Sequence, residues 1–143
     1  MNRLLCRVLA IGMVALTHGL TAQARAPVAN APDPAALQRG EQIYQRCAAC
    51  HAVESNRTGP QHCGLFGRHA GTAPGYDSYS QAMRASGIVW DAQTLNVFLQ
   101  DPMKTVPGTT MTYAGVKDPT ERTDLIAWLR EATRAGTACR LSQ

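Results

Sequence analysis

Apolar side chains recur at helical spacing in the stretch that follows Asp33. Asp33 and Pro34 are residue types favoured at the N-cap and the first position of a helix. The apolar or small positions after them lie mostly three or four residues apart: Ala36, Gly40, Ile43, Tyr44 and Cys47. This pattern predicts a helix over about residues 34–46 with one face turned to the core.

Two further helices and one short one are predicted later in the chain. The first is capped by Asp91 and must end before Pro102, because the residue before a proline avoids helical backbone. The second follows Asp118, with Glu121 placed for a capping box, and ends before Gly136. The buried stripes of these two helices would be formed by Leu95, Phe98 and Leu99, and by Leu125, Trp128, Leu129 and Ala132. Residues 80–85 are predicted to form a short helix.

The remaining segments are irregular. Between residues 52 and 79, Gly, Pro, Ser, Thr and Asn occur at short intervals without a sustained period of two or 3.6. We find no strand pattern anywhere, which predicts an all-α fold of about four helices with long loops. A chain with so much loop and only two Phe and two Trp residues buries little apolar surface. It needs a covalent staple or a large apolar cofactor to offset the entropy lost on ordering.

The first 24 residues have the layout of a secretory signal. Arg3 and Arg7 precede an apolar run at residues 8–16, and a polar region ends with Ala22 and Ala24 at the small-residue positions. The run is too short for a permanent transmembrane helix. We therefore expect a signal peptide at residues 1–24, cleaved after Ala24, and a periplasmic protein without stable membrane insertion. A flexible extension at residues 25–33 would lead into one domain at residues 34–143.

Charge along the chain is weak and scattered. There are 14 Lys+Arg and 10 Asp+Glu residues, a formal net charge of +4, and removal of the signal peptide would take away Arg3 and Arg7. The sequence has no clustered basic patch and no basic amphipathic helix. Nucleic acids and lipid surfaces are therefore not expected as partners.

The segment CAACH at residues 47–51 has the C-x-x-C-H pattern that attaches haem covalently. The thiols of Cys47 and Cys50, about one helical turn apart, can add to the two vinyl groups of haem as thioethers. His51 then lies under the ring, where its imidazole can bind the iron. The predicted cofactor is one covalently attached haem c, held by Cys47, Cys50 and His51.

Two other uses of this cysteine pair are less well supported. A thioredoxin-like pair should follow a strand in a βαβ pattern, which the sequence lacks. A zinc site would need more ligands and could recruit His62, Cys63, His69 or Cys139, but these do not form a second close pair.

The second axial position of the iron determines the function. A methionine or histidine there gives an electron carrier, whereas an open position allows ligand binding or catalysis. The downstream candidates are Met83, Met103 and Met111. Spacing favours Met111, which follows Pro107 in a Gly-rich segment that can fold over a flat ring. Met103 is expected at the surface, and Met83 lies in the short helix.

At these residues the chain resembles class I cytochrome c, in the branch of mitochondrial cytochrome c and its small soluble bacterial relatives. The matching motifs occur in family order: CAACH, TGP, GLFGR, GTAPGY, GIVW, PGTTM, YAG and ERTDLIAWL. They extend over about residues 40–133. The resemblance implies the class I cytochrome c fold, with helices and long loops wrapped around one haem, and His51 and Met111 as iron ligands.

The resemblance also implies roles for residues around the haem. Pro60 would accept a hydrogen bond from the His51 ring and so fix its tautomer and orientation. Arg68, Tyr79 and Trp90 would hold a haem propionate, with surface charge and plain core packing as the alternatives for these residues. Thr109 would lie beside the methionine sulfur. The first and last helices would cross at Gly40, Tyr44, Leu125 and Trp128.

The chain departs from this family on the methionine side. Phe98 stands where relatives commonly have a tyrosine, and Met83 stands where asparagine is common. This predicts a drier methionine side and an altered reduction potential. One extra residue in GYDSYS could shift Tyr79, and most of the lysines that relatives use for docking are missing.

Cys63 and Cys139 remain once the haem and the signal peptide account for the other cysteines. The resemblance places Cys63 in the loop on the histidine side of the haem and Cys139 just after the last helix. In an oxidising compartment we expect a disulfide between them, with two unpaired cysteines as the alternative. His62 is expected to pack or to be exposed rather than to bind a metal.

The predicted function is electron transfer rather than enzymatic catalysis. With both axial positions filled by the protein, the iron has no open site for a substrate. We expect a soluble, monomeric periplasmic carrier that passes one electron between respiratory or photosynthetic redox partners. Two alternatives stay open: a dedicated haem subunit of a periplasmic dehydrogenase, and a haem enzyme or sensor if Met111 leaves the iron.

Overall fold

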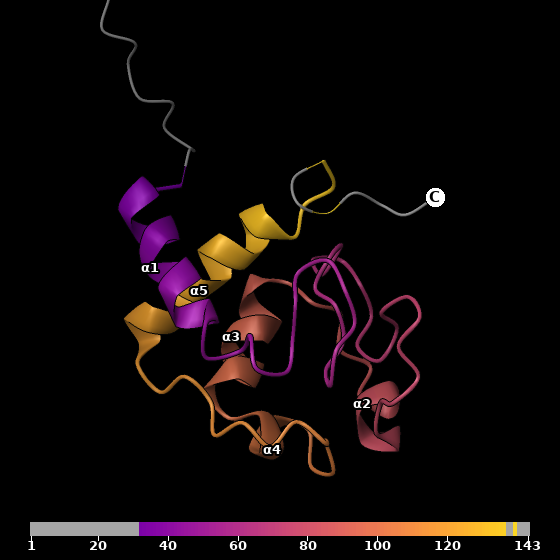
Figure 1. Cartoon of the computed structure of the whole chain (residues 1–143). Helices are drawn as coiled ribbons and strands as arrows, with labels where there is room; N and C mark the ends of the chain where they lie inside the picture. The colour runs from indigo at the N-terminus through magenta and orange to yellow at the C-terminus, as the bar shows by residue number, and fades with distance from the viewer. Residues whose placement is uncertain (1–31, 137–138, 140–143) are drawn as a thin grey trace, which may run out of the picture.

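The computed structural model describes residues 32–136 and residue 139, and this part of the chain forms five helices (Figure 1). They are α1 (Pro34–Tyr44), α2 (Gln81–Ala85), α3 (Ala92–Gln100), α4 (Pro102–Thr105) and α5 (Pro119–Ala132). Within the described residues there is no β-strand, only isolated bridges such as the one between His69 and Val89. The prediction of an all-α fold is confirmed. The predicted signal peptide and residues 25–31 of the predicted extension lie outside the described residues.

The three longer helices begin where their aspartate caps predict. The Asp33 carboxylate accepts a hydrogen bond from the Ala35 N–H at 3.0 Å, and Asp118 accepts from two N–H groups of the first turn of α5. A reciprocal capping box forms at Asp91 and Thr94. The box expected at Asp118 is incomplete, because the Glu121 side chain pairs instead with Arg46, at 2.6 Å.

Two boundaries differ from the sequence prediction. The first helix ends at Tyr44, about two residues early, and the backbone continues as turns through Cys50. The sequence does not predict the one-turn helix α4, because Pro102 is a stop signal for α3. Pro102 also serves as the first residue of α4, and the Asp101 carboxylate caps this turn by accepting from the Lys104 N–H at 3.2 Å.

Helices α1 and α5 cross and pack directly on each other (Figure 1). Gly40 permits this approach, because a Cβ at that position would collide with the Asp124 carbonyl oxygen and with Trp128 Cβ. The Tyr44 and Trp128 rings pack beside the crossing, with centroids 4.5 Å apart. An ion pair of 2.6 Å between Arg39 and Asp124 also joins the two helices. The predicted crossing point is therefore confirmed.

The long loops occupy the other part of the molecule. In Figure 1, the segment of residues 51–80 and α2 lie on the side away from α1. The shared core is formed by side chains from the helices and the loops, among them Leu65, Trp90, Phe98 and Leu125. None of the described helices has the length and apolar character needed to cross a bilayer.

Candidate haem site

A cavity of about 310 Å³ lies between the helices and the loops, and its lining is mainly apolar. All the residues predicted to bind the cofactor contribute to its walls: Cys47, Cys50, His51, Pro60, Arg68, Tyr79, Trp90, Thr109 and Met111. These residues come from segments far apart in the sequence. The structure thus brings the complete predicted set to one cavity.

The two cysteines and His51 reach this cavity through a single turn of backbone after α1. The Cys47 N–H donates to the Tyr44 carbonyl at 2.8 Å, and the His51 N–H donates to the Cys47 carbonyl at 2.9 Å. Neither Cys47 nor Cys50 is part of a disulfide. Both thiols and the imidazole therefore line the same cavity, as covalent attachment of a haem with an axial histidine requires.

The surroundings of Cys47 do not suit dithiol redox chemistry. Burial raises the pKa of the Cys47 thiol to about 11, although the nearby Arg46 acts in the opposite direction. Reactive C-x-x-C thiols have lowered pKa values instead. Within residues 32–136 and 139, no three His, Cys, Asp or Glu side chains group so that they could hold a metal ion, so the zinc alternative has no ligand set there.

One ring nitrogen of His51 forms a hydrogen bond to the protein backbone. Its Nδ1 donates a hydrogen bond to the Pro60 carbonyl at 2.8 Å, which leaves Nε2 for a metal. Burial lowers the pKa of His51 and favours a neutral ring, and this effect outweighs the opposite effect of the Pro60 bond. Gly59 lies against the same ring, and a Cβ at Gly59 would collide with it.

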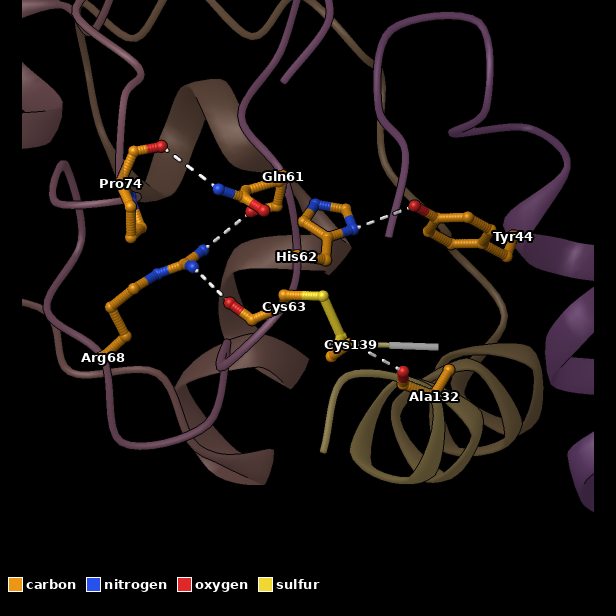
Figure 2. The surroundings of a disulfide bond; sticks show 8 residues. All are labelled: Tyr44, Gln61, His62, Cys63, Arg68, Pro74, Ala132 and Cys139. Carbon is orange, nitrogen blue, oxygen red and sulfur yellow. Dashed lines mark hydrogen bonds between the residues drawn. A yellow bond between two sulfur atoms is a disulfide. The ribbon is translucent and has the colours of Figure 1, made fainter. Parts of the chain in front are cut away.

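His62 is a site residue that the sequence analysis missed. Its ring stacks on that of His51, with centroids 4.5 Å apart and planes 23° from parallel. Its Nδ1 is 3.1 Å from the hydroxyl oxygen of Tyr44 (Figure 2). Burial holds the pKa of His62 well below its usual range, and the nearby His51 and Arg68 act in the same direction. The sequence does contain one indication of this contact. His62 lies two residues after Pro60, and Pro60 is already predicted to lie beside His51.

Arg68 reaches the other side of the segment that carries His62 (Figure 2). Its Nη1 donates to the Cys63 carbonyl at 2.7 Å and its Nη2 to the Gln61 carbonyl at 3.0 Å. The third guanidinium nitrogen, Nε, is buried and has no hydrogen-bond partner among the described residues. Burial lowers the pKa of Arg68. A partly buried cation in the cavity wall with an unpaired donor is suited to an anionic group such as a carboxylate.

Tyr79 and Trp90 lie in the cavity wall with Arg68. The Tyr79 hydroxyl oxygen accepts a hydrogen bond from the Ala73 N–H at 3.2 Å, so its own proton remains available to donate. Trp90 is buried and packs on Phe98, with centroids 5.0 Å apart. The extra residue in GYDSYS does not move Tyr79 out of the cavity.

On the methionine side, the cavity lining contains apolar side chains and also the threonines that flank Met111. Phe98 and Met83 are both buried and line the cavity together with Met111, whereas Met103 is 47% exposed and does not. The Thr109 hydroxyl accepts a hydrogen bond from the Met111 N–H at 3.2 Å. The hydroxyl proton of Thr109 is not used in this bond and can be donated to a sulfur atom nearby.

Comparison with known proteins decides the family. The sequence model of the cytochrome c family matches residues 37–133. The chain is a class I cytochrome c. It is 44% identical over 108 residues to the cytochrome c of Sesamum indicum, covering 73% of this chain and 96% of that protein. It is 41% identical over 110 residues to the cytochrome c2 of Blastochloris viridis, covering 73% and 86%.

A solved structure gives the same result for the fold. Cytochrome cH from Methylobacterium extorquens aligns with a TM-score of 0.64 and 42% sequence identity, over 66% of this chain and 97% of that one. The cytochrome therefore carries one covalently bound haem c with its iron, and it belongs to a family of electron-transfer proteins. The cavity fits this cofactor in its mainly apolar walls, its two thiols, its oriented imidazole and its partly buried cation.

The remaining two described cysteines of the cytochrome lie beside this site. The structure joins Cys63 and Cys139 in a disulfide, with Cα atoms 5.2 Å apart (Figure 2). A backbone hydrogen bond of 2.8 Å from the Gly64 N–H to the Thr133 carbonyl lies next to it. Together they connect the loop that holds His62 to the chain just after α5.

Proposed function

We propose that this cytochrome is an electron carrier in which His51 and Met111 bind the haem iron and Cys47 and Cys50 form the thioether bonds. The proposal rests on one observation: the C-x-x-C-H turn and Met111 line the same apolar cavity. The haem supplies reversible one-electron chemistry at its iron. With a protein ligand on each side, the iron has no vacant position for a substrate, so we propose that the protein is not an enzyme.

The chain's own residues would keep the geometry constant during electron transfer. The Pro60 carbonyl orients His51 through the 2.8 Å hydrogen bond. Arg68 Nε and the Tyr79 hydroxyl proton are the free donors available to a haem propionate, in a wall completed by Trp90. The Thr109 hydroxyl already accepts a hydrogen bond from the Met111 N–H, and its proton can be donated to the sulfur. None of these roles requires movement of the surrounding backbone.

Location and partners belong to the same proposal. The signal-like pattern supports export to the periplasm with cleavage after Ala24, an extension at residues 25–33 and a cytochrome domain at residues 34–143. The partners would be a redox protein that donates one electron and another that accepts it, and the carrier would act as a monomer. The similarity to cytochrome c2 and cytochrome cH of bacteria supports this placement.

The axial ligand can be tested by absorption spectroscopy of the purified ferric holoprotein. A weak band near the red end of the visible range, from sulfur-to-iron charge transfer, is expected for the wild type and should disappear in Met111→Ala. The exposed Met103 provides the matched control, and Met103→Ala should keep the band. A wild-type protein without this band at neutral pH would contradict methionine ligation and favour a haem enzyme or sensor.

The mass of the exported protein checks cleavage after Ala24.

A further inference from the structure

His62 connects the axial histidine to α1. One face of its ring lies against His51, with ring centroids 4.5 Å apart. Its Nδ1 lies 3.1 Å from the hydroxyl oxygen of Tyr44 (Figure 2). Tyr44 is itself buried and packed on Trp128 of α5, with ring centroids 4.5 Å apart. The His62 ring therefore contacts the His51 ring with one face and the hydroxyl of the firmly packed Tyr44 with its Nδ1.

The backbone that carries His62 is also held in place. The His62 N–H donates to the Val53 carbonyl at 3.0 Å, and the Cys63 N–H donates to the same carbonyl at 2.8 Å. The carbonyl groups on either side of His62, those of Gln61 and Cys63, both accept hydrogen bonds from Arg68. His62 thus presents its ring to His51 from a rigid support rather than from a free loop.

A ring contact of this kind adds a second restraint to the one that the Pro60 bond supplies. An imidazole bound to iron through Nε2 can still rotate about that bond, and a hydrogen bond at Nδ1 restrains one atom of the ring. A flat neighbour against the ring face restrains the plane as a whole. The orientation of this plane relative to the haem determines how the imidazole orbitals overlap with those of the iron.

We propose that His62, held by the Tyr44 hydroxyl, is a positioning residue that fixes the plane of the axial His51 ring. This inference rests on the proposed assignment of His51 as an iron ligand. It adds to that assignment a second, separate support for the ring, formed by the stacked His62 and its hydrogen bond to Tyr44. The role requires no change in the charge of His62.

Nuclear magnetic resonance of the ferric holoprotein reports this plane directly, because the paramagnetic shifts of the haem methyl groups depend on the direction of the axial ring. Tyr44→Phe removes only the hydroxyl, and His62→Phe keeps a stacked ring but removes its hydrogen bond. His62→Leu removes both. The matched control is His69→Phe, since His69 is exposed and does not line the cavity.

We expect Tyr44→Phe and His62→Phe to change the methyl shift pattern in the same direction and His62→Leu to change it more. The double variant Tyr44→Phe/His62→Phe should differ from the wild type no more than either single variant, since all three lack the same bond. His69→Phe should keep the wild-type pattern. A reduction potential that follows the methyl shifts across the series would support the positioning role.

Unchanged methyl shifts in His62→Leu, in a protein that is folded by circular dichroism, would overturn the proposal. Lower thermal stability without altered shifts would also overturn it, because it would show a packing role alone. If a His62 variant does not fold, Tyr44→Phe still tests the proposal, since it is the mildest change in the series. Failure of the proposed function is distinguishable, because the wild type itself would then lack the absorption spectrum of a low-spin haem with histidine and methionine ligands.

Discussion

At the scale of single residues, the surroundings of Arg68 point most clearly to a bound haem. The Arg68 guanidinium is a partly buried cation, and among residues 32–136 and 139 no carboxylate forms an ion pair with it. Its two terminal nitrogens each donate to a carbonyl group, and Nε has no partner among these residues, so donors remain for an anion. Burying a cation without a counter-charge is unfavourable, so a haem propionate would stabilise both the side chain and the cavity.

Replacing Arg68 should lower the reduction potential. A nearby positive charge favours the ferrous haem, which carries one more electron, over the ferric haem. We expect Arg68→Gln to lower the potential by on the order of tens of millivolts in a redox titration of the holoprotein. Arg130→Gln is the control, because Arg130 packs over Phe66 and does not line the cavity. An equal shift in both variants would show that Arg68 acts only through the overall charge.

The methionine side of the cavity can be tested by adding a single oxygen atom. Phe98 is buried and lines the cavity with Met111, so Phe98→Tyr places a hydroxyl on this side. A hydrogen bond to the sulfur would reduce its donation to the iron and change the reduction potential. Phe66→Tyr adds the same hydroxyl outside the cavity lining and should leave the potential unchanged. If Phe98→Tyr also has the wild-type potential, the idea of a drier methionine side is wrong.

At the scale of helices, the crossing of α1 and α5 depends on the absence of a side chain at Gly40. The Asp124 carbonyl and Trp128 Cβ occupy the space that a Cβ would need, and the ion pair of Arg39 with Asp124 lies beside them. This crossing is where α1 is anchored before the chain turns into the C-x-x-C-H segment. A shift of α1 would therefore move the attachment turn relative to the cavity.

Gly40→Ala should destabilise the protein, although alanine is the better helix former. Propensity alone would stabilise α1 by about 1 kcal/mol, whereas overpacking at a tight contact costs about 1–3 kcal/mol, and the collision with backbone favours the upper end. We expect a net loss of about 1–2 kcal/mol in the free energy of unfolding of the holoprotein, measured with denaturant. Gln38→Ala, on the exposed face of α1, should change it little. A stabilised Gly40→Ala variant would contradict the crossing geometry.

The sequence predicts those elements whose determinants are local. Asp33, Asp91 and Asp118 fix the starts of three helices because a cap needs only the next few backbone N–H groups. The one-turn helix after Pro102 was missed because a proline can both stop one helix and begin the next. The stacking of His62 on His51 and the free Nε of Arg68 were also missed. Both depend on loops whose path is set by contacts distant in sequence, which periodicity does not encode.

At the scale of the molecule, the Cys63–Cys139 disulfide closes a loop with a sequence separation of 76. The chain-entropy account gives about 4 kcal/mol for a loop of this length. We expect the double variant Cys63→Ala/Cys139→Ala to lose about 2–4 kcal/mol of unfolding free energy. Reductant should lower the denaturation midpoint of the wild type but not that of the double variant. Detection of two free thiols in the untreated holoprotein would show that the bridge does not form.

The overall charge predicts weak electrostatic steering toward partners. The formal net charge of the full chain is +4, and loss of Arg3 and Arg7 with the predicted signal peptide reduces it by two. Ionised propionates and the iron contribute about −1 in the ferric and about −2 in the ferrous state, so the mature holoprotein is close to neutral. Association rates of nearly neutral proteins depend little on salt, because screening removes only local interactions.

This can be measured with two small inorganic oxidants of opposite charge, which report the charge at the electron-transfer edge without a protein partner. We expect the oxidation rate with each to change by less than about threefold between low and high salt. Lys104→Gln tests for local steering by an exposed lysine, and Lys117→Gln is the control, since Lys117 pairs with Asp101 at 3.3 Å. The oxidation rate with the anionic oxidant could instead fall steeply with salt, and this fall could be lost in Lys104→Gln alone. That result would show that a local positive surface guides docking although the net charge is close to zero.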